Sequence, residues 1–130
     1  MIVVDASVLV AVIADDSDTA RRFAAEIAGE DAAAPHLLDC EVVSAIRRLR
    51  RQGDLSEEQA LEALADLHSF PIERFPLGGL IDRIWQLGKT ITAYDAAYVA
   101  LGEALDAPLV TSDAKLARAH GHECEIRLLV

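Results

Sequence analysis

The chain has 130 residues, of which 52% are hydrophobic and 26% are charged. This length predicts one domain spanning residues 1–130, with enough apolar material for a core that needs no disulfide or structural metal. The composition excludes intrinsic disorder, collagen-like repeats and low-complexity architecture. Because 12 Lys and Arg stand against 22 Asp and Glu, the net charge of −10 excludes nucleic-acid binding by bulk electrostatics alone.

Two further features bear on the compartment. Cys40 and Cys124 match no closely spaced zinc or redox pattern, so we expect two small, buried, reduced thiols. The apolar stretch over residues 2–14 contains Asp5, lacks a basic leader and is shorter than the ~20 residues that span a bilayer. We therefore expect a cytoplasmic protein with no membrane segment.

The first third of the chain predicts alternating strands and helices. The β-branched run Ile2–Val4 predicts a buried strand, and the apolar residues within 8–13 recur at helical spacing. A second helix is predicted over Asp18–Ile27, with Gly29 ending it. A short strand is predicted over Ala32–Pro35.

The middle of the chain predicts two helices in succession. Asp39 is predicted to N-cap a helix whose apolar residues lie within 42–49 and which ends before Gly53. Ser56 and Gln59 have the spacing of a capping box and predict the start of the next helix. The apolar stripe expected on that helix consists of Leu61, Leu64 and Leu67.

The last part of the chain repeats the alternation. The predicted elements are a strand over Ile72–Phe75, a helix over 80–87, a helix over 95–105, a strand over 108–111, a short helix over 113–119 and a strand over 125–129. Strands separated by helices favour a mainly parallel sheet with helices on both faces. The predicted fold class is therefore α/β, a three-layer sandwich.

Four acidic residues have a common relation to these elements. Asp5 directly follows the first strand, and Glu41 lies in the first turn of the helix after the second strand. Asp95 opens a helix about 16 Å long, and the next strand returns a similar distance to end just before Asp113. If the strands are parallel, all four acids share the carboxyl edge of the sheet, where open α/β sheets bind ligands.

Four carboxylates in one cleft repel one another, and no Lys or Arg beside Asp5, Asp95 or Asp113 is an evident neutraliser. A set of oxygen ligands without His or Cys favours Mg²⁺ or Mn²⁺. The hydroxyl groups expected to add contacts belong to Ser7, Thr111 and Ser112. The alternative interpretation is structural, because Asp39, Asp95 and Asp113 each also suit a helix N-cap.

Four motifs carry a family resemblance: Val3-Val4-Asp5-Ala6-Ser7, Glu41 with Ser44-Ala45-Ile46-Arg47-Arg48, Asp95-Ala96-Ala97-Tyr98-Val99-Ala100-Leu101, and Leu109-Val110-Thr111-Ser112-Asp113. In this order, over essentially the whole chain, they resemble the PIN-domain ribonucleases, specifically the short VapC-type toxins of toxin–antitoxin pairs. The resemblance implies a PIN-like fold and a Mg²⁺- or Mn²⁺-dependent endoribonuclease that hydrolyses RNA. It implies that Asp5, Glu41, Asp95 and Asp113 bind the metal, supported by Ser7 and Ser112.

The resemblance also implies partners. A VapB-type antitoxin would insert a C-terminal segment into or beside the acidic cleft, and the toxin would form a homodimer. Exposed apolar positions around Leu61 and Trp85 are the candidate dimer surface. Gly102 stands where relatives more often carry Ala, which we expect to affect helix propensity rather than chemistry.

Two other functions remain open. A Mg²⁺-dependent phosphohydrolase or receiver-like domain is disfavoured, because Ser7 occupies the second position of the Asp-x-Asp pattern and no lysine follows a late strand. A non-catalytic module could instead dock a basic peptide on the acidic edge. Metal-dependent turnover distinguishes these hypotheses.

The basic residues are concentrated at one place in the chain. The set Arg47, Arg48, Arg50 and Arg51 holds four of the 12 basic residues. These arginines suit contacts with RNA phosphates, but the favoured interpretation is pairing with the helix dipole, with acids on the next helix or with an antitoxin. Their helix carries Glu41 at its opposite end. His120 and His122 are expected in an exposed turn, and Trp85 and Tyr98 as core or dimer contacts.

Overall fold

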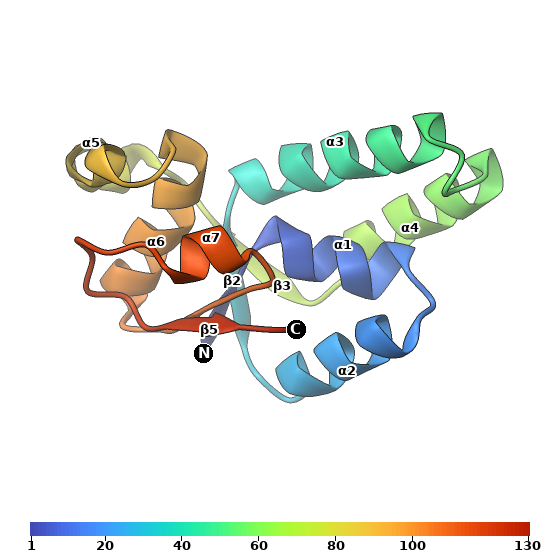
Figure 1. Ribbon diagram of the computed structural model, residues 1–130, viewed down its shortest axis with the longest axis horizontal. Helices are drawn as coiled ribbons and strands as arrows, with labels where there is room; N and C mark the ends of the chain where they lie inside the picture. Colours follow the sequence, from blue (N-terminus) through green and yellow to red (C-terminus); the bar gives the residue numbers. More distant parts are fainter.

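The protein, described over residues 1–130 by a computed structural model, is built around one sheet of five strands (Figure 1). The strands are β1 (Ile2–Val4), β2 (Ala32–Pro35), β3 (Ile72–Phe75), β4 (Leu109–Thr111) and β5 (Ile126–Leu128). Their order across the sheet is β3-β2-β1-β4-β5, and every neighbouring pair is parallel. The predicted α/β fold with a parallel sheet is confirmed.

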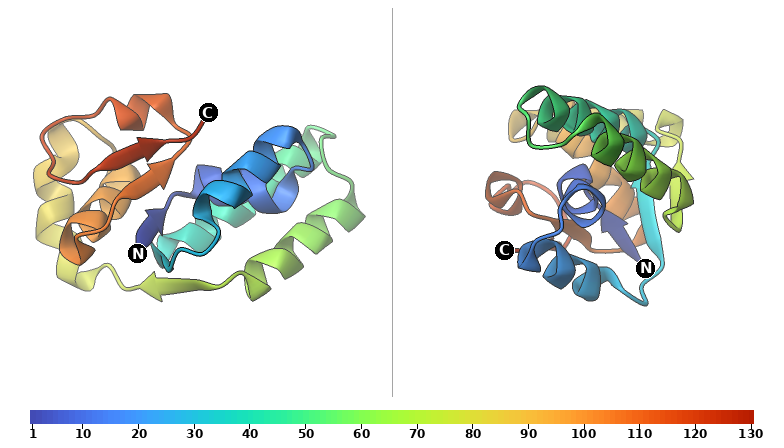
Figure 2. Two further views of the ribbon diagram at one scale, coloured as in Figure 1. Left: turned by 90° about the horizontal axis from the view of Figure 1, so that it is seen from below. Right: turned by 90° about the vertical axis from the view of Figure 1, so that its right-hand side faces the viewer.

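Helices make the connections between the strands. They are α1 (Ala6–Ala14), α2 (Asp18–Ile27), α3 (Leu37–Arg51), α4 (Glu57–Ser69), α5 (Ile81–Gln86), α6 (Ala93–Leu105) and α7 (Ala114–Ala117), with short 3₁₀ turns η1 (Gly78–Leu80) and η2 (Leu87–Lys89) flanking α5. Figure 1 shows α1 to α4 on one side of the molecule and α5 to α7 on the other. In Figure 2, left, β4 and β5 lie side by side beneath α7, as their pairing requires.

The core is densest around β1 and α6. Every residue of β1 is buried, and α6 is buried over seven consecutive residues from Ala96 to Gly102. A helix that is buried on all sides must be apolar all round, and small residues let it approach its neighbours closely. Because α6 contacts β1, β2 and β4 together, its first turn is fixed relative to the carboxyl ends of these strands.

Local signals in the sequence predicted several boundaries correctly. Ser56 and Gln59 form the predicted reciprocal capping box at the start of α4. Helix α2 has the predicted bounds, and Gly29 follows it with φ of 79°, a left-handed conformation that glycine adopts without steric cost. These agreements arise because capping and termination depend on a few neighbouring residues.

Other expectations for the helices were wrong. Helix α3 begins at Leu37, so Asp39 is not its N-cap. The Asp39 carboxylate instead accepts hydrogen bonds from Nε (2.8 Å) and Nη2 (2.9 Å) of Arg74 on β3. The helix predicted over residues 80–87 is divided into η1, α5 and η2. Tertiary pairing and packing therefore override the local pattern at both places.

Exposure decides between the expectations for two apolar side chains. Leu61, expected in the apolar stripe of α4 and also near an exposed apolar surface, is 58% exposed, because α4 buries the face that carries Ala60, Ala63 and Leu67. Trp85, expected as a core or dimer contact, is 85% exposed and is no core residue. The expectation of two buried cysteines was wrong for one of them. Cys40 is exposed whereas Cys124 is buried, and both are free thiols.

None of the helices combines the length and hydropathy that a bilayer crossing requires.

Gly102 is required by close packing, a role that its sequence context did not reveal. A Cβ at this position would lie 2.6 Å from Sγ of Cys124 and 2.9 Å from the carbonyl oxygen of Ala107. Real Cβ atoms essentially never approach so closely. Gly102 therefore lets the segment around Cys124 pack directly against the C-terminal half of α6.

We expect Gly102→Ala to lower the free energy of unfolding by about 1–3 kcal/mol, because the added methyl group overpacks a closed contact. Gly79→Ala is the matched control: nothing lies within 4 Å of its added Cβ, so its effect should stay within about 0.5 kcal/mol. Urea denaturation measures both. Equal stability of the wild type and Gly102→Ala would contradict the packing argument.

Candidate active site

The parallel pairing of β1 with β4 brings two parts of the predicted site together. Val4 stands opposite Val110 in the register, and the backbone N–H of Asp5 donates to the carbonyl of Val110 at 3.0 Å. Asp5, which follows β1, and Thr111, the last residue of β4, are therefore adjacent although they lie more than 100 positions apart. Hydrogen bonds continue the sheet to its carboxyl edge.

Asp5 is the most enclosed of the four acids, with 8% of its surface exposed. Its Oδ2 accepts hydrogen bonds from Oγ of Ser7 at 2.6 Å and from Oγ1 of Thr111 at 2.8 Å. Both bonds end on one oxygen, so Oδ1 has no protein donor. A buried carboxylate with one bonded and one open oxygen is well suited to bind a cation.

Backbone N–H groups complete this hydroxyl network. The N–H of Ser112 donates to Oγ of Ser7 at 3.2 Å, and the N–H of Asp113 donates to Oγ1 of Thr111 at 3.1 Å. Ser112 thus contributes its backbone N–H to the network, and the contact of its hydroxyl with an ion stays a prediction. The hydroxyl of Thr111, which is fully buried, contacts Asp5 directly.

Asp95 and Asp113 stand at the starts of two helices, but only one of them is an N-cap. Thr92 caps α6 by accepting from the N–H of Asp95, so the N-cap interpretation of Asp95 is wrong. Asp113 does cap α7, since its Oδ1 accepts from the N–H groups of Lys115 and Leu116. The N-cap interpretation of Asp113 is confirmed and leaves its Oδ2 unbonded.

Glu41 is brought in by a separate helix. It lies one turn later than predicted, because α3 already begins at Leu37. The ion pair between Asp39 and Arg74 ties the start of α3 to β3. Oε1 of Glu41 accepts a hydrogen bond of 2.6 Å from the hydroxyl of Tyr98 on α6.

The four acids interact electrostatically. Burial raises the pKa of Glu41, and the charges of Asp5 and Asp95 raise it further against the opposing Tyr98 hydrogen bond. Burial also raises the pKa of Asp95, and Asp5 and Asp113 add to the effect. The structure thus gathers all four predicted carboxylates at one edge of the sheet. Their repulsion raises the cost of keeping Glu41 and Asp95 ionised.

Two groups near Asp95 were missed in the sequence. Lys115 lies close enough to oppose the rise in the pKa of Asp95, although burial and the neighbouring acids outweigh it. Its position two residues after Asp113 is a signal that the sequence analysis overlooked. Tyr98, expected in the core, is indeed buried but also contacts Glu41. Its spacing of three residues from Asp95 was the available signal, because such residues share a helix face.

The donor set fits a hard divalent cation in chemistry, since its members are carboxylates whose mutual repulsion one lysine does not offset. No three His, Cys, Asp or Glu side chains are yet arranged around one point as ligands of an ion. The oxygens without protein donors, Oδ1 of Asp5 and Oδ2 of Asp113, are available to one. The fit therefore rests on donor chemistry and on open carboxylate oxygens.

The remaining candidates lie away from the acids. Nε of Arg50 donates to Glu57 on α4 at 3.0 Å, so this pairing, which the sequence favoured, is confirmed for Arg50. The exposed members of the arginine cluster that form no ion pair are Arg47, Arg48 and Arg51. Nε2 of His122 contacts the carbonyl of Ala119 at 2.9 Å, within the turn before β5.

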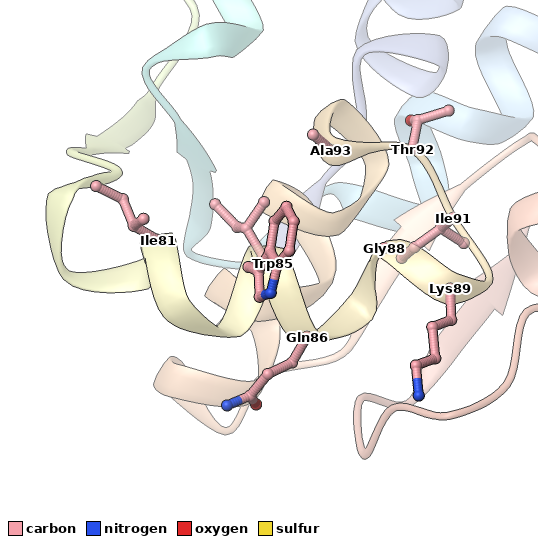
Figure 3. Close-up of a pocket in the computed structure, with 9 residues that line it drawn as sticks. Ile81, Trp85, Gln86, Gly88, Lys89, Ile91, Thr92 and Ala93 are labelled. Atoms are coloured by element: carbon pink, nitrogen blue, oxygen red, sulfur yellow. The ribbon is translucent and has the colours of Figure 1, made fainter.

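A pocket of about 960 Å³ is lined by residues of α5, η2 and the start of α6, most of them hydrophobic; Figure 3 shows its lining. Its wall includes Ile81 and Trp85 from α5, and it ends at Thr92 and Ala93, directly before the turn that carries Asp95. Its polar lining includes Gln86, Lys89 and Thr92, and no carboxylate that could hold a divalent cation lines it. The chemistry of the candidate active site therefore lies at the acidic edge and not in the larger pocket.

We expect Asp95→Asn to raise the melting temperature of the metal-free protein by a few degrees at neutral pH. A carboxyl whose pKa is raised on folding costs stability when ionised, and the cost disappears below both its folded and its unfolded pKa. The advantage of the variant over the wild type should therefore shrink toward zero as the pH falls below 3.8, the ordinary value for Asp.

Circular dichroism melting curves of both proteins with a chelator test this expectation. Asp54→Asn is the control, because it removes one equally negative but exposed charge from the loop between α3 and α4. An Asp95→Asn variant less stable than the wild type at neutral pH would contradict the proposed electrostatic strain.

Comparison with known proteins places this geometry in a family. The model of the PIN domain matches residues 2–121. Ribonuclease VapC1 of Mycobacterium tuberculosis is 44% identical over 128 residues, covering 98% of this chain and 96% of the relative. VapC ribonuclease Mb0985 of Mycobacterium bovis is 40% identical over 129 residues, covering 99% and 98%.

A solved structure shares this fold. A toxin–antitoxin complex from Klebsiella pneumoniae contains a chain that superposes with a TM-score of 0.68 at 15% identity, covering 91% of each chain. With the match of the domain model and the two full-length relatives, the conclusion is direct: the chain belongs to the PIN-domain family, and within it to the VapC ribonucleases.

Proposed function

We propose that this protein is a metal-dependent endoribonuclease and the toxin of a type II toxin–antitoxin pair. The observation that carries the proposal is the gathering of Asp5, Glu41, Asp95 and Asp113 at one edge of the sheet in a chain of the VapC family. Membership in this family supports RNA cleavage. The choice of Mg²⁺ or Mn²⁺ is supported by the exclusively oxygen-based ligands.

The roles of the residues follow from their surroundings. A divalent ion at this edge would supply Lewis-acid stabilisation of a phosphate ester and lower the pKa of a water nucleophile. Asp5, Asp95 and Asp113 would hold the ion, and Glu41 would be a further ligand or orient the attacking water. The hydroxyls of Ser7 and Thr111 fix the Asp5 carboxylate by hydrogen bonds to Oδ2.

An acidic protein holds RNA through local contacts, because its net charge of −10 opposes long-range attraction. An ion at the acidic edge would supply part of the missing positive charge. Contact of RNA phosphates with Arg47, Arg48 or Arg51 remains a secondary proposal. These exposed arginines lie beyond Glu41 toward the far end of α3, roughly 10–15 Å along the helix axis.

A VapB-type antitoxin is the proposed protein partner. Carboxylates held together without full compensation attract cationic groups, so a basic segment of the partner would compete for the same edge. The toxin–antitoxin complex that contains a chain of this fold supports pairing with an antitoxin. Metal-dependent turnover separates this proposal from the alternative of a purely binding module.

We also infer one domain over residues 1–130, supported by a single sheet that takes in strands from both ends of the chain. We infer the cytoplasm as the place of action, supported by the RNA substrate and by two free thiols.

We expect the purified protein, freed of antitoxin, to cut a pool of structured RNAs into discrete products with Mg²⁺ or Mn²⁺. A chelator should abolish cleavage, and Asp5→Asn should lower the rate by about 100-fold or more, since it removes a ligand charge at an enclosed position. Gel electrophoresis of end-labelled RNA measures both effects. Asp54→Asn, which removes an exposed charge, should cut at the wild-type rate.

Chelator-resistant cleavage would contradict the metal mechanism, and full activity of Asp5→Asn would contradict the assignment of the site. If the wild type binds Mn²⁺ and its antitoxin but cuts no RNA, the non-catalytic binding module becomes the better description.

The homodimer remains a proposal, and the structure favours one of its two candidate surfaces. Leu61 stands alone on α4, whereas the exposed side chains of Ile81 and Trp85 line one pocket together. Exposed apolar side chains that lie together are a candidate surface for a protein contact.

We expect Trp85→Ser to shift the mass of the particle in solution from twice 14.0 kDa toward a single chain, because Trp85 is 85% exposed and central to this face. Leu61→Ser is the control, and it should stay dimeric. Light scattering after size-exclusion chromatography measures the masses. A dimeric Trp85→Ser protein would exclude this face as the dimer contact, and a monomeric wild type would leave the face to another partner.

A further inference from the structure

Tyr98 contacts the acidic edge from inside the core. Its side chain is completely buried, and its hydroxyl donates to Oε1 of Glu41 at 2.6 Å. Tyr98 belongs to α6 and Glu41 to α3, and the two residues are 57 positions apart in the sequence. The bond therefore joins two helices that are distant along the chain. One phenol thus links two of the helices that carry the site.

The bond is short and its donor has no competing acceptor. No other protein acceptor is hydrogen-bonded to this hydroxyl, and its burial excludes exchange with bulk water. A neutral donor to a carboxylate forms a charge-assisted hydrogen bond, which is stronger and more directional than a neutral one. The bond therefore restricts the rotamers of Glu41, which belongs to a helix that contributes no other member of the acidic set.

The position of Tyr98 on α6 relates the orientation of Glu41 to Asp95. Asp95 lies three residues earlier on the same helix, so the two side chains emerge from one face. Because Tyr98 holds Glu41, it fixes the position of the Glu41 carboxylate relative to Asp95. Oε2 of Glu41 accepts no protein hydrogen bond and is left for a ligand.

We propose that Tyr98 is a positioning residue that holds Glu41 by Oε1 and presents Oε2 to the divalent ion. The inference rests on the proposed function for its metal but not for its RNA substrate. Outer partners that orient a metal ligand change metal affinity or activity by 10- to 100-fold when they are lost. A structural role alone would instead affect stability and leave metal binding unchanged.

The test compares Tyr98→Phe with the wild type by calorimetric titration of Mn²⁺ into the metal-free proteins. We expect Mn²⁺ to bind Tyr98→Phe about 10- to 100-fold more weakly, because Glu41 loses the bond that orients it. Tyr94→Phe is the matched control on the same helix. Its hydroxyl is on a side chain that is 66% exposed and makes no hydrogen bond, so its affinity should be that of the wild type.

A second pair of variants tests whether Tyr98 acts through Glu41. In a Glu41→Gln background, Tyr98→Phe should weaken Mn²⁺ binding by less than about two-fold, because the ligand that it orients is already gone. In RNA cleavage, raising the Mn²⁺ concentration to saturation should restore much of the kcat of Tyr98→Phe. A purely structural defect would not be restored by the ion.

Three results would overturn the inference. They are wild-type Mn²⁺ affinity in Tyr98→Phe, an equal loss of affinity in both backgrounds, or a Tyr98→Phe protein that fails to fold. A wild type that binds Mn²⁺ but cuts no RNA would contradict the proposed nuclease. The Mn²⁺ affinities of Tyr98→Phe and the wild type would still test the role of Tyr98. A wild type that binds no Mn²⁺ would overturn the inference and the metal mechanism together.

Discussion

The pairing of β1 with β4 is the constraint on which the site depends. By setting Val4 beside Val110, it brings Asp5 against Thr111 and starts the turn that ends at Asp113. The buried apolar side chains of β1 and α6, which pack against each other, stabilise this pairing. Carboxylates that repel one another are thus held together by hydrophobic burial some distance away from them.

Stability and chemistry oppose each other at this edge. Asp5 is accommodated by the hydroxyls of Ser7 and Thr111, whereas Glu41 and Asp95 have raised pKa values because burial and neighbouring acids disfavour their ionised forms. An ion or a basic segment of a partner would relieve the same repulsion. The local electrostatic cost is therefore also the source of affinity for either ligand.

The polar and apolar contact surfaces of the molecule adjoin at the start of α6. The acidic edge adjoins the apolar pocket around Trp85, and Thr92 at the start of α6 borders both. At the other end of α3, Arg50 pairs with Glu57, far from Glu41. Surfaces of opposite chemistry therefore meet at the first turn of α6.

The sequence by itself determined the alternation of strands and helices, the capping box at Ser56 and the places of the four acids relative to these elements, because these depend on residue spacing and local capping. Only the tertiary structure decided which face of α4 is buried, that Asp39 pairs with Arg74, and that Gly102 must be small. It also decided the contact of Tyr98 with Glu41, because residues 57 positions apart meet only when α3 and α6 pack around β1 and β2. Such contacts depend on the global arrangement of the chain, which no local pattern encodes.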